Sequence, residues 1–133
     1  MNITKLPVII RAGSIKKPRL DVNYPIVDGM KNKAVQQRIN KTIQRTVDKL
    51  VRDQGFFENN QTDVTGSFEI KNNQREILSL SIINYAFSGG AHGMTIIKSL
   101  TIDVETGKVY ELKDLFKPNS LWISLFPDFR LSD

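Results

Sequence analysis

The sequence predicts an α+β fold in which one long amphipathic helix packs on an antiparallel β-sheet of about four to six strands. Two observations predict it. A helical pattern of apolar residues runs from Lys31 to Asp53, and strand-like segments with alternating apolar and polar side chains come after it. The chain has 133 residues, which suffices for one hydrophobic core. We therefore expect a single compact unit over residues 1–133.

The first 29 residues predict short strands of the edge type. They are rich in proline and β-branched residues. Pro7, Pro18 and Pro25 each lack the N–H that a central strand would donate, so these segments fit the edge of a sheet best. The pair Asp28-Gly29 then predicts a turn before the helix.

The helix predicted over Lys31–Asp53 carries an apolar row and a basic row. The apolar row recurs every three or four residues and consists of Val35, Ile39, Ile43, Val47, Leu50 and Val51. The basic row has nearly the same period and consists of Arg38, Lys41, Arg45, Lys49 and Arg52. Because Ile39 and Lys41 lie about 200° apart on a helix of about 3.6 residues per turn, the rows face opposite sides. The helix should end at Gln54-Gly55, with glycine as its C-cap.

Four candidate strands follow the polar loop Glu58–Asp63. They are Val64–Lys71, Glu76–Phe87, Gly93–Val104 and Lys108–Leu112. Asn72-Asn73-Gln74 and Glu105-Thr106-Gly107 are the expected hairpin turns. The third strand places Met94, Ile96, Leu100, Ile102 and Val104 on one face, and Ile97 and Lys98 interrupt its alternation. We expect the helix to cover this apolar face.

Composition limits the partners and the compartment. The net charge of +5 and the pI near 9.6 permit contact with polyanions such as nucleic acid, anionic lipid or wall polymers. The chain contains no cysteine, which excludes disulfides and thiolate metal sites. No apolar run reaches the roughly 18–20 residues of a membrane span. The start of the chain has no leader-like apolar region, so either the protein stays inside the cell or its leader is not part of this chain.

The segment Ser88-Gly89-Gly90-Ala91-His92-Gly93 is the strongest candidate for a functional loop. It holds three of the eight glycines and the only histidine. It matches neither nucleotide-binding glycine motif, and one histidine without cysteine cannot supply the three or four ligands that zinc normally takes. A triad based on Ser88 and His92 would need a carboxylate such as Asp103 or Asp114, and no spacing places these groups together. We expect no metal and no cofactor.

Several alternatives stay open for the histidine and the basic row. His92 could fix the loop through backbone hydrogen bonds, contact a ligand, or act in catalysis. The basic row could be a solvated helix face or a contact for a polyanion. It contains no interleaved aromatic residues, and no nucleic-acid-binding module is visible, so we expect no nucleic-acid partner. No spacing of carboxylates singles out a pair for glycoside hydrolysis.

Three segments carry a resemblance to a known family. They are Ile83–Gly93 with its GGAHG corner, Ile102–Lys108 ending in TGK, and Leu112–Phe116 with DLF. The chain resembles a bacterial domain family of unassigned activity that has this signature. Tyr24–Gly29 followed by Val35–Asn40 is similar to the companion domain that usually precedes it.

The resemblance also predicts how the chain is divided. Residues 8–65 are similar to the companion domain, residues 66–118 to a C-terminally truncated GGAHG domain, and residues 119–133 form an atypical tail. The family continues after the DLF segment with a helix and further strands, whereas this tail is apolar and holds the only tryptophan. A sheet edge left open in this way could pair with a second copy, so a homo-oligomer is one expectation.

The resemblance implies an extracytoplasmic or membrane-tethered module of the Gram-positive cell envelope. The domain pair occurs in the ectodomain of the lysozyme-sensing anti-sigma factor RsiV and before the catalytic domain of the peptidoglycan deacetylase PdaC. It implies a non-enzymatic sensor or accessory domain that binds a wall polymer or a protein. The alternative is a peptidoglycan- or teichoic-acid-binding module of a wall-modifying enzyme. The charge of +5 disfavours a lysozyme-receptor role, because lysozyme is itself basic.

The residues expected to contact a ligand come from two places. The glycine corner contributes Tyr85, Ser88, Gly89, Gly90 and His92. The basic helix row contributes Arg38, Lys41, Arg45 and Lys49. We expect no catalytic residue among them.

Overall fold

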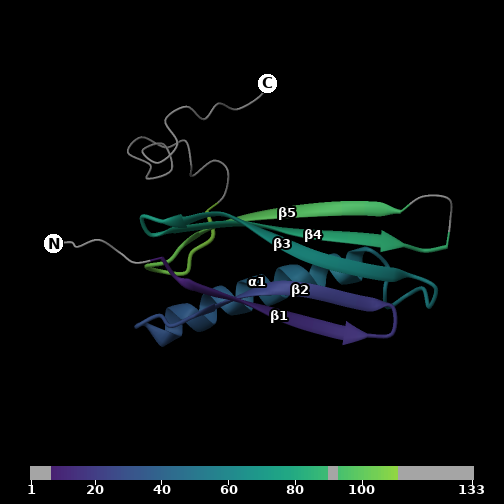
Figure 1. Ribbon diagram of the computed structural model, residues 1–133, viewed down its shortest axis with the longest axis horizontal. Helices are drawn as coiled ribbons and strands as arrows, with labels where there is room; N and C mark the ends of the chain where they lie inside the picture. The colour runs from purple at the N-terminus through teal and green to yellow at the C-terminus, as the bar shows by residue number, and fades with distance from the viewer. Residues whose placement is uncertain (1–6, 90–92, 111–133) are drawn as a thin grey trace, which may run out of the picture.

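The computed structural model describes residues 7–89 and 93–110, and within them one helix packs on one face of a five-stranded sheet (Figure 1). The elements in chain order are β1 (Ile9–Lys17), β2 (Leu20–Asp28), α1 (Lys33–Asp53), β3 (Asp63–Gln74), β4 (Ile77–Phe87) and β5 (Met94–Asp103). The strands lie side by side in the same order, from β1 at one edge to β5 at the other. The predicted α+β fold is confirmed.

One strand pair departs from the expected antiparallel sheet. β2 and β3 run parallel, with Leu20–Val22 opposite Val64–Gly66, whereas the other neighbouring pairs are antiparallel. The reason is the position of α1 between these two strands in the chain. The helix carries the chain back along the length of the sheet, so β3 starts at the same end as β2.

The N-terminal strands form a hairpin. β1 is the edge strand, as expected, but β2 is an inner strand where it pairs with β3. The pairing of β2 with β3 stops at Val22, so Pro25 removes no hydrogen bond on that side. Arg19 completes the turn of the hairpin in the left-handed region, with a φ of 65°.

The helix ends at the predicted place, Gln54-Gly55, and begins two residues later than predicted. The side chain of Asn32 accepts a hydrogen bond from the Val35 N–H at 3.1 Å, which satisfies one of the free donors of the first turn. Gln54 is the C-cap, and Gly55 follows it with a φ of 86°. This left-handed conformation favours glycine and ends the helix.

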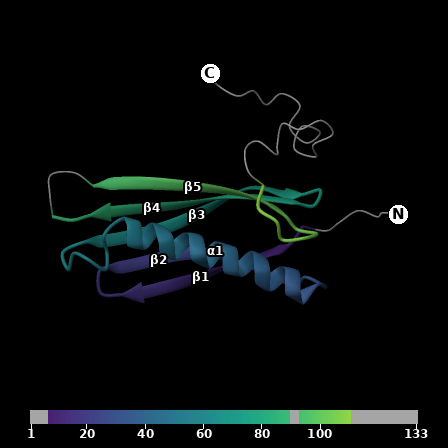
Figure 2. The ribbon, with the colours of Figure 1, turned by 180° about the vertical axis from the view of Figure 1, so that it is seen from behind.

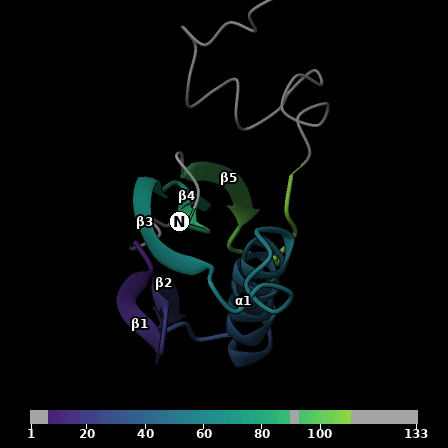
Figure 3. The ribbon, with the colours of Figure 1, turned by 90° about the vertical axis from the view of Figure 1, so that its right-hand side faces the viewer.

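The core lies between the apolar row of α1 and the inner face of the sheet. The buried helix residues are Ile39, Ile43, Val47, Leu50 and Val51. They pack with buried strand residues that include Val22, Val27, Leu78, Leu80 and Ile82. Figure 2 shows α1 lying across the sheet, and Figure 3 shows the sheet curving around it. The predicted helix cover is confirmed.

The β3–β4 turn lies later in the chain than predicted. β3 continues to Gln74, and the turn consists of Arg75 and Glu76 rather than Asn72-Asn73-Gln74. Both turn residues have positive φ values, 53° and 68°. A two-residue turn with two left-handed residues matches the twist of antiparallel strands, which is why it is preferred here although neither residue is glycine.

The last strands follow the prediction in part. Leu100 and Ile102 of β5 are buried, but Met94 is exposed. The predicted strand Lys108–Leu112 lies partly outside the described residues, and its described part forms only an isolated bridge between Val109 and Ile102. No helix in the described ranges is long and apolar enough to cross a membrane.

Candidate functional site

Three connections meet at one end of the sheet, which we call the three-loop end (right-hand side of Figure 1). They are the β1–β2 turn at residues 18–19, the α1–β3 loop at residues 54–62, and the start of the β4–β5 connection at residues 88–89. The glycine corner predicted from the sequence belongs to the last of these. Loops that are held on a rigid scaffold are the usual place for binding residues.

Hydrogen bonds join the three connections. The Val64 N–H donates to the carbonyl oxygen of Arg19 at 2.9 Å, which ties the β1–β2 turn to the start of β3. The hydroxyls of Thr62 and Ser88 share a hydrogen bond of 2.9 Å, which ties the α1–β3 loop to the glycine corner. Thr62 is buried, so this bond satisfies a hydroxyl that water does not reach. The end therefore forms one connected surface.

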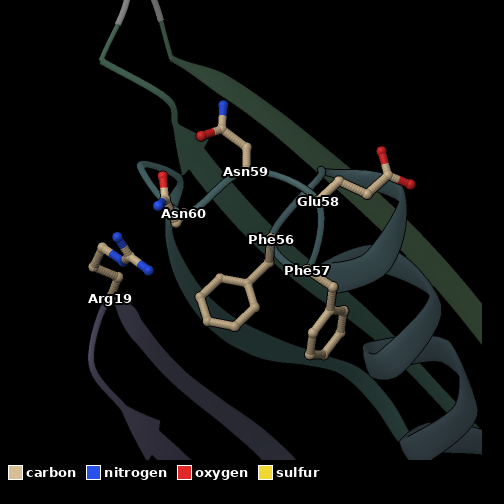
Figure 4. A pocket seen from close by; sticks show the side chains of 6 residues that line it. All are labelled: Arg19, Phe56, Phe57, Glu58, Asn59 and Asn60. Atoms are coloured by element: carbon tan, nitrogen blue, oxygen red, sulfur yellow. The ribbon is translucent and has the colours of Figure 1, made fainter.

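This surface contains a depression of about 670 Å³ (Figure 4). It is lined by Arg19, Phe56, Phe57, Glu58, Asn59 and Asn60. Its volume falls in the range of about 300–1,000 Å³ that is common for ligand pockets. The lining groups are aromatic rings, amides, one guanidinium and one carboxylate, which are able to stack, to form hydrogen bonds and to pair with charge.

The two phenylalanines have different environments. The rings of Phe56 and Phe57 meet edge to face, with 5.2 Å between centroids and 83° between planes. Phe56 is half-buried and packs against the core. Phe57 is 66% exposed. Its ring is thus presented to solvent and steadied from one side by a ring that the core holds.

The glycine corner is described only in part. Ser88 and Gly89 are exposed, and Gly89 has a φ of 82°, whereas Gly90 and His92 lie outside the described residues. The Tyr85 ring, which is 43% exposed, lies so close to Gly93 that a Cβ atom there would overlap it. A glycine is therefore required beside Tyr85, as expected where another group approaches the backbone closely.

Two polar side chains, those of Gln54 and Asn84, lie beneath the surface next to this corner. The Gln54 side-chain amide donates to the backbone carbonyls of Asn84 at 3.2 Å and Met94 at 3.4 Å. Asn84 is fully buried, and Gly66 opposite leaves room for its side chain. Within the described residues, the Asn84 amide atoms and Gln54 Oε1 have no hydrogen-bond partner. The end of α1 is thus linked to the strands that carry the corner.

The basic row runs along α1, so its first member lies far from the corner. Arg38 donates to the Thr106 carbonyl at 3.2 Å and packs over Gly107, at the opposite end of the sheet. Lys49 forms an ion pair of 2.7 Å with Asp53. Lys41 and Arg45 are exposed and form no ion pair within the described ranges. The predicted binding residues therefore do not form a single site.

The charge environment is most clearly altered at Asp28, at the end of β2 away from the three-loop end. The Gly29 N–H, at 2.8 Å, and the Arg11 guanidinium, at 2.9 Å, hold the pKa of this carboxyl below its usual value. In the part of the chain that the structure describes, no group of three or more histidine, aspartate or glutamate side chains could hold a metal ion.

The binding residues predicted from the sequence do not include Arg19, Phe56 or Phe57. The signal for the phenylalanines was present, since two adjacent aromatic residues follow the helix-ending Gly55 and precede a polar loop. Aromatic residues in a loop of this kind either pack against the core or remain on the surface. Here Phe56 packs against the core and Phe57 remains on the surface. Nothing in the sequence indicated that the distant Arg19 would join them.

Comparison with known proteins identifies the family. The family described as "Deacetylase PdaC" matches residues 15–95, which is more than half of the chain, and the chain belongs to this family. The matched part runs from β1 to the start of β5. The resemblance drawn from the GGAHG, TGK and DLF segments and the companion domain is confirmed. None of the curated proteins matches the chain.

Two solved structures share the fold. A DUF3298 family protein from Pseudomonas aeruginosa PAO1 is 16% identical, with a TM-score of 0.59 over 86% of this chain and 59% of that one. A member of the same family from Bacteroides fragilis is 13% identical, with a TM-score of 0.53 over 94% of this chain and 68% of that one. The chain thus spans less than two thirds of the first of these proteins. At these identities the likeness concerns the fold alone.

Proposed function

We propose that this chain is a non-enzymatic binding domain, which acts as a sensor or accessory module in the cell envelope as part of an exported or membrane-tethered protein. Membership of the PdaC family supports an envelope setting. The observation that carries the binding role is the depression at the three-loop end, where Phe57 is exposed on loops that are tied to the sheet. Exposed aromatic residues on a fixed scaffold are typical of recognition surfaces.

The environment of Ser88 supports a non-catalytic role. Its hydroxyl is bonded to the hydroxyl of Thr62, whereas a catalytic serine is activated by a neighbouring general base. The bond instead joins two loops, which is a structural task. The side chains that line the depression offer ring contacts, amide hydrogen bonds and charge, which are suited to hold a ligand.

The test for catalysis uses the full chain and purified peptidoglycan. We expect no release of reducing ends or acetate above the buffer control. Release that is lost in Ser88→Ala or His92→Ala would overturn the proposal, because it would assign a reaction to the glycine corner.

The test for binding uses envelope fragments before and after protease treatment. We expect the chain to co-sediment with the untreated fragments. Loss of binding after protease treatment would indicate a protein ligand, and retained binding would indicate a wall polymer. Failure to bind either preparation would contradict the binding role.

A second candidate function is a polymer-binding module of a wall-modifying enzyme. Lys41 and Arg45 favour it, since both are exposed and form no ion pair with another described residue. It predicts that binding to wall teichoic acid weakens steeply with salt, since exposed charges are screened. Arg45→Glu should weaken binding more than Lys49→Glu, because Lys49 is already paired with Asp53. Binding that does not change with salt would exclude this candidate.

A further inference from the structure

We propose that the depression at the three-loop end is a docking site for an acidic segment of a protein partner. In this complex, Phe57 inserts into an apolar hollow of the partner and Arg19 pairs with a partner carboxylate. The inference rests on the proposed binding function, and it names the site and the chemistry of the partner. Neither the family nor the two structural relatives assign a role to these residues.

Phe57 has the properties of an interface anchor. Two thirds of its side chain is exposed, and the ring is packed edge to face on the core-held Phe56. Such an arrangement limits the movement of the ring before binding, so that less entropy is lost when the partner covers it. Aromatic residues of this kind dominate the energetics of protein interfaces.

Arg19 supplies a positive charge on a backbone position that the fold holds in place. Its carbonyl is bonded to the Val64 N–H, and its backbone is held at a φ of 65° in the turn of the first hairpin. The side chain is exposed, and within the described ranges it forms no ion pair. In Figure 4 it extends toward Asn60, while Glu58 points away from it on the far side of the loop. The guanidinium can therefore receive a carboxylate in its planar fork.

Charge complementarity favours an acidic partner. Lys16 and Lys17 are exposed in the same hairpin, immediately before the turn that holds Arg19. The chain as a whole carries a charge of +5. Charges on the rim of an interface increase the rate of encounter with a partner of opposite charge and suppress partners of like charge.

The ring geometry favours a protein over a glycan. The planes of Phe56 and Phe57 are nearly perpendicular, so the two rings do not form a flat platform for a sugar ring. The exposed Phe57 ring instead projects from the surface, so it can insert between side chains of a partner protein. An anionic polymer would be expected to follow the basic row of α1, which is a different surface.

The experiment selects peptides from a random displayed library on the full chain. We expect the selected peptides to carry aspartate or glutamate within a few positions of a large apolar residue. Phe57→Ala should weaken their binding about 30-fold, the ratio that corresponds to the roughly 2 kcal/mol of an interface hot spot. Arg19→Gly should weaken it about tenfold, and Arg19→Lys less, because lysine keeps the charge without the fork.

Matched controls lie away from the site. Arg75→Gly also removes an arginine with positive φ, but from the β3–β4 turn at the opposite end of the sheet. Ile97→Ala removes an apolar side chain on β5 that is 61% exposed. Both variants should bind the selected peptides within about twofold of the wild type, since surface substitutions outside a contact have small effects. Phe57→Tyr keeps the ring and should keep most of the affinity, which separates loss of contact from loss of fold.

The failures of the two proposals can be told apart. Selection of neutral or basic peptides, or binding unchanged in both Phe57→Ala and Arg19→Gly, would overturn the docking site. If envelope fragments still bind in that case, the proposed binding function stands. Sensitivity of glycan binding to Phe57→Ala would overturn the assignment to a protein partner, and peptidoglycan turnover would overturn the proposed function itself.

Discussion

At one end of the sheet, side chains are bonded to the backbone of neighbouring elements, whereas at the three-loop end several side chains extend into solvent. The first end, which we call the anchored end, contains the β3–β4 turn, the start of α1 and residues 104–107. There, Asn73 exchanges two hydrogen bonds with the backbone of Val8, at 3.0 and 2.8 Å. At the three-loop end, Phe57 is two-thirds exposed and Arg19 forms no ion pair within the described ranges.

The two ends of one small sheet can therefore have different roles, one in stabilising the fold and the other in presenting binding residues to solvent. Side-chain amides at the anchored end satisfy backbone groups that the sheet ladder leaves free. The loops at the other end are also tied, by the Thr62–Ser88 bond and by Gln54, but they leave Phe57 and Arg19 extending into solvent. Binding residues can change on such loops with little effect on the core, because the contacts that stabilise the fold lie elsewhere.

The largest expected difference between the two regions comes from asparagine substitutions. Asn40 on α1 accepts from the Val27 N–H at 2.8 Å and donates to the Val27 carbonyl at 2.9 Å. Asn40→Ala should lower the free energy of unfolding by about 2–4 kcal/mol, because it leaves two groups of the buried Val27 unpaired. Urea unfolding measures this loss.

Asn60→Ala is the control at the three-loop end. Asn60 is exposed, and its substitution should change the free energy of unfolding by less than about 0.5 kcal/mol. Equal losses for the two asparagine variants would contradict the distinction between the anchored end and the three-loop end.

Two glycines, one at each end of the sheet, allow the stability of the two ends to be compared directly. Gly107 and Gly55 both have positive φ, 80° and 86°, so alanine at either position should cost about 1–2 kcal/mol of stability. A Cβ atom at Gly107 would lie 3.0 Å from the Arg38 side chain, whereas nothing lies within 4 Å at Gly55. Gly107→Ala should therefore be the more destabilising variant in thermal or urea unfolding.

Arg38→Ala provides the check on this explanation. In that background the excess cost of Gly107→Ala over Gly55→Ala should disappear, because the crowding side chain is gone. An excess that persists would mean that the anchored end is sensitive to Gly107 for a reason other than contact with Arg38.

Ser88→Ala tests the hydrogen bond that joins two loops of the three-loop end. Loss of the 2.9 Å hydrogen bond to Thr62 should cost about 1 kcal/mol of unfolding free energy. Ser99→Ala, which removes a 3.1 Å hydroxyl contact with Ser81 in the sheet, is the matched control and should cost a similar amount. Hydrogen exchange should increase in residues 54–62 for Ser88→Ala only. Exchange that rises throughout the sheet would show that this bond is part of the core instead.

The smallest effect concerns pH at the anchored end. Because the folded-state pKa of Asp28 is lowered, its stabilising contribution is present above the unfolded pKa and is lost as the pH falls through the folded one, below about pH 4. Asp28→Asn should therefore lose less stability than the wild type between pH 7 and pH 3, measured by urea midpoints. The contribution is small because the carboxyl group and its Arg11 partner are exposed. A larger loss in the variant would contradict the assigned direction.

The helix and its buried face could be predicted from the sequence because they depend on local periodicity. Gly55 also marked the helix end correctly, since the left-handed region is accessible to glycine with little strain. The β3–β4 turn was misplaced, because Asn72 and Asn73 are typical turn residues but here bond to the backbone of other segments. Their local preference was overridden by tertiary contacts.

The candidate site could be predicted only in part. Ser88 and Gly89 were recognised from an unusual local composition, and the structure places them at the three-loop end. Arg19 and Phe57 were missed because they are 38 residues apart in the sequence and become neighbours only through the parallel pairing of β2 with β3. No periodicity within either segment carries that information.

The sequence by itself determined the fold class and the amphipathic helix with its core-facing row, because both depend on patterns among residues that are close together in the chain. It also determined the family, through several short segments that are recognisable without the fold. The tertiary structure alone decided which surface holds the depression and which basic residues bond to distant segments. Arg38 and Arg45 belong to the same helix row and are both exposed, yet only Arg38 donates a hydrogen bond to a distant turn. The physical reason is that a side chain's role depends on which chain segments fold against it.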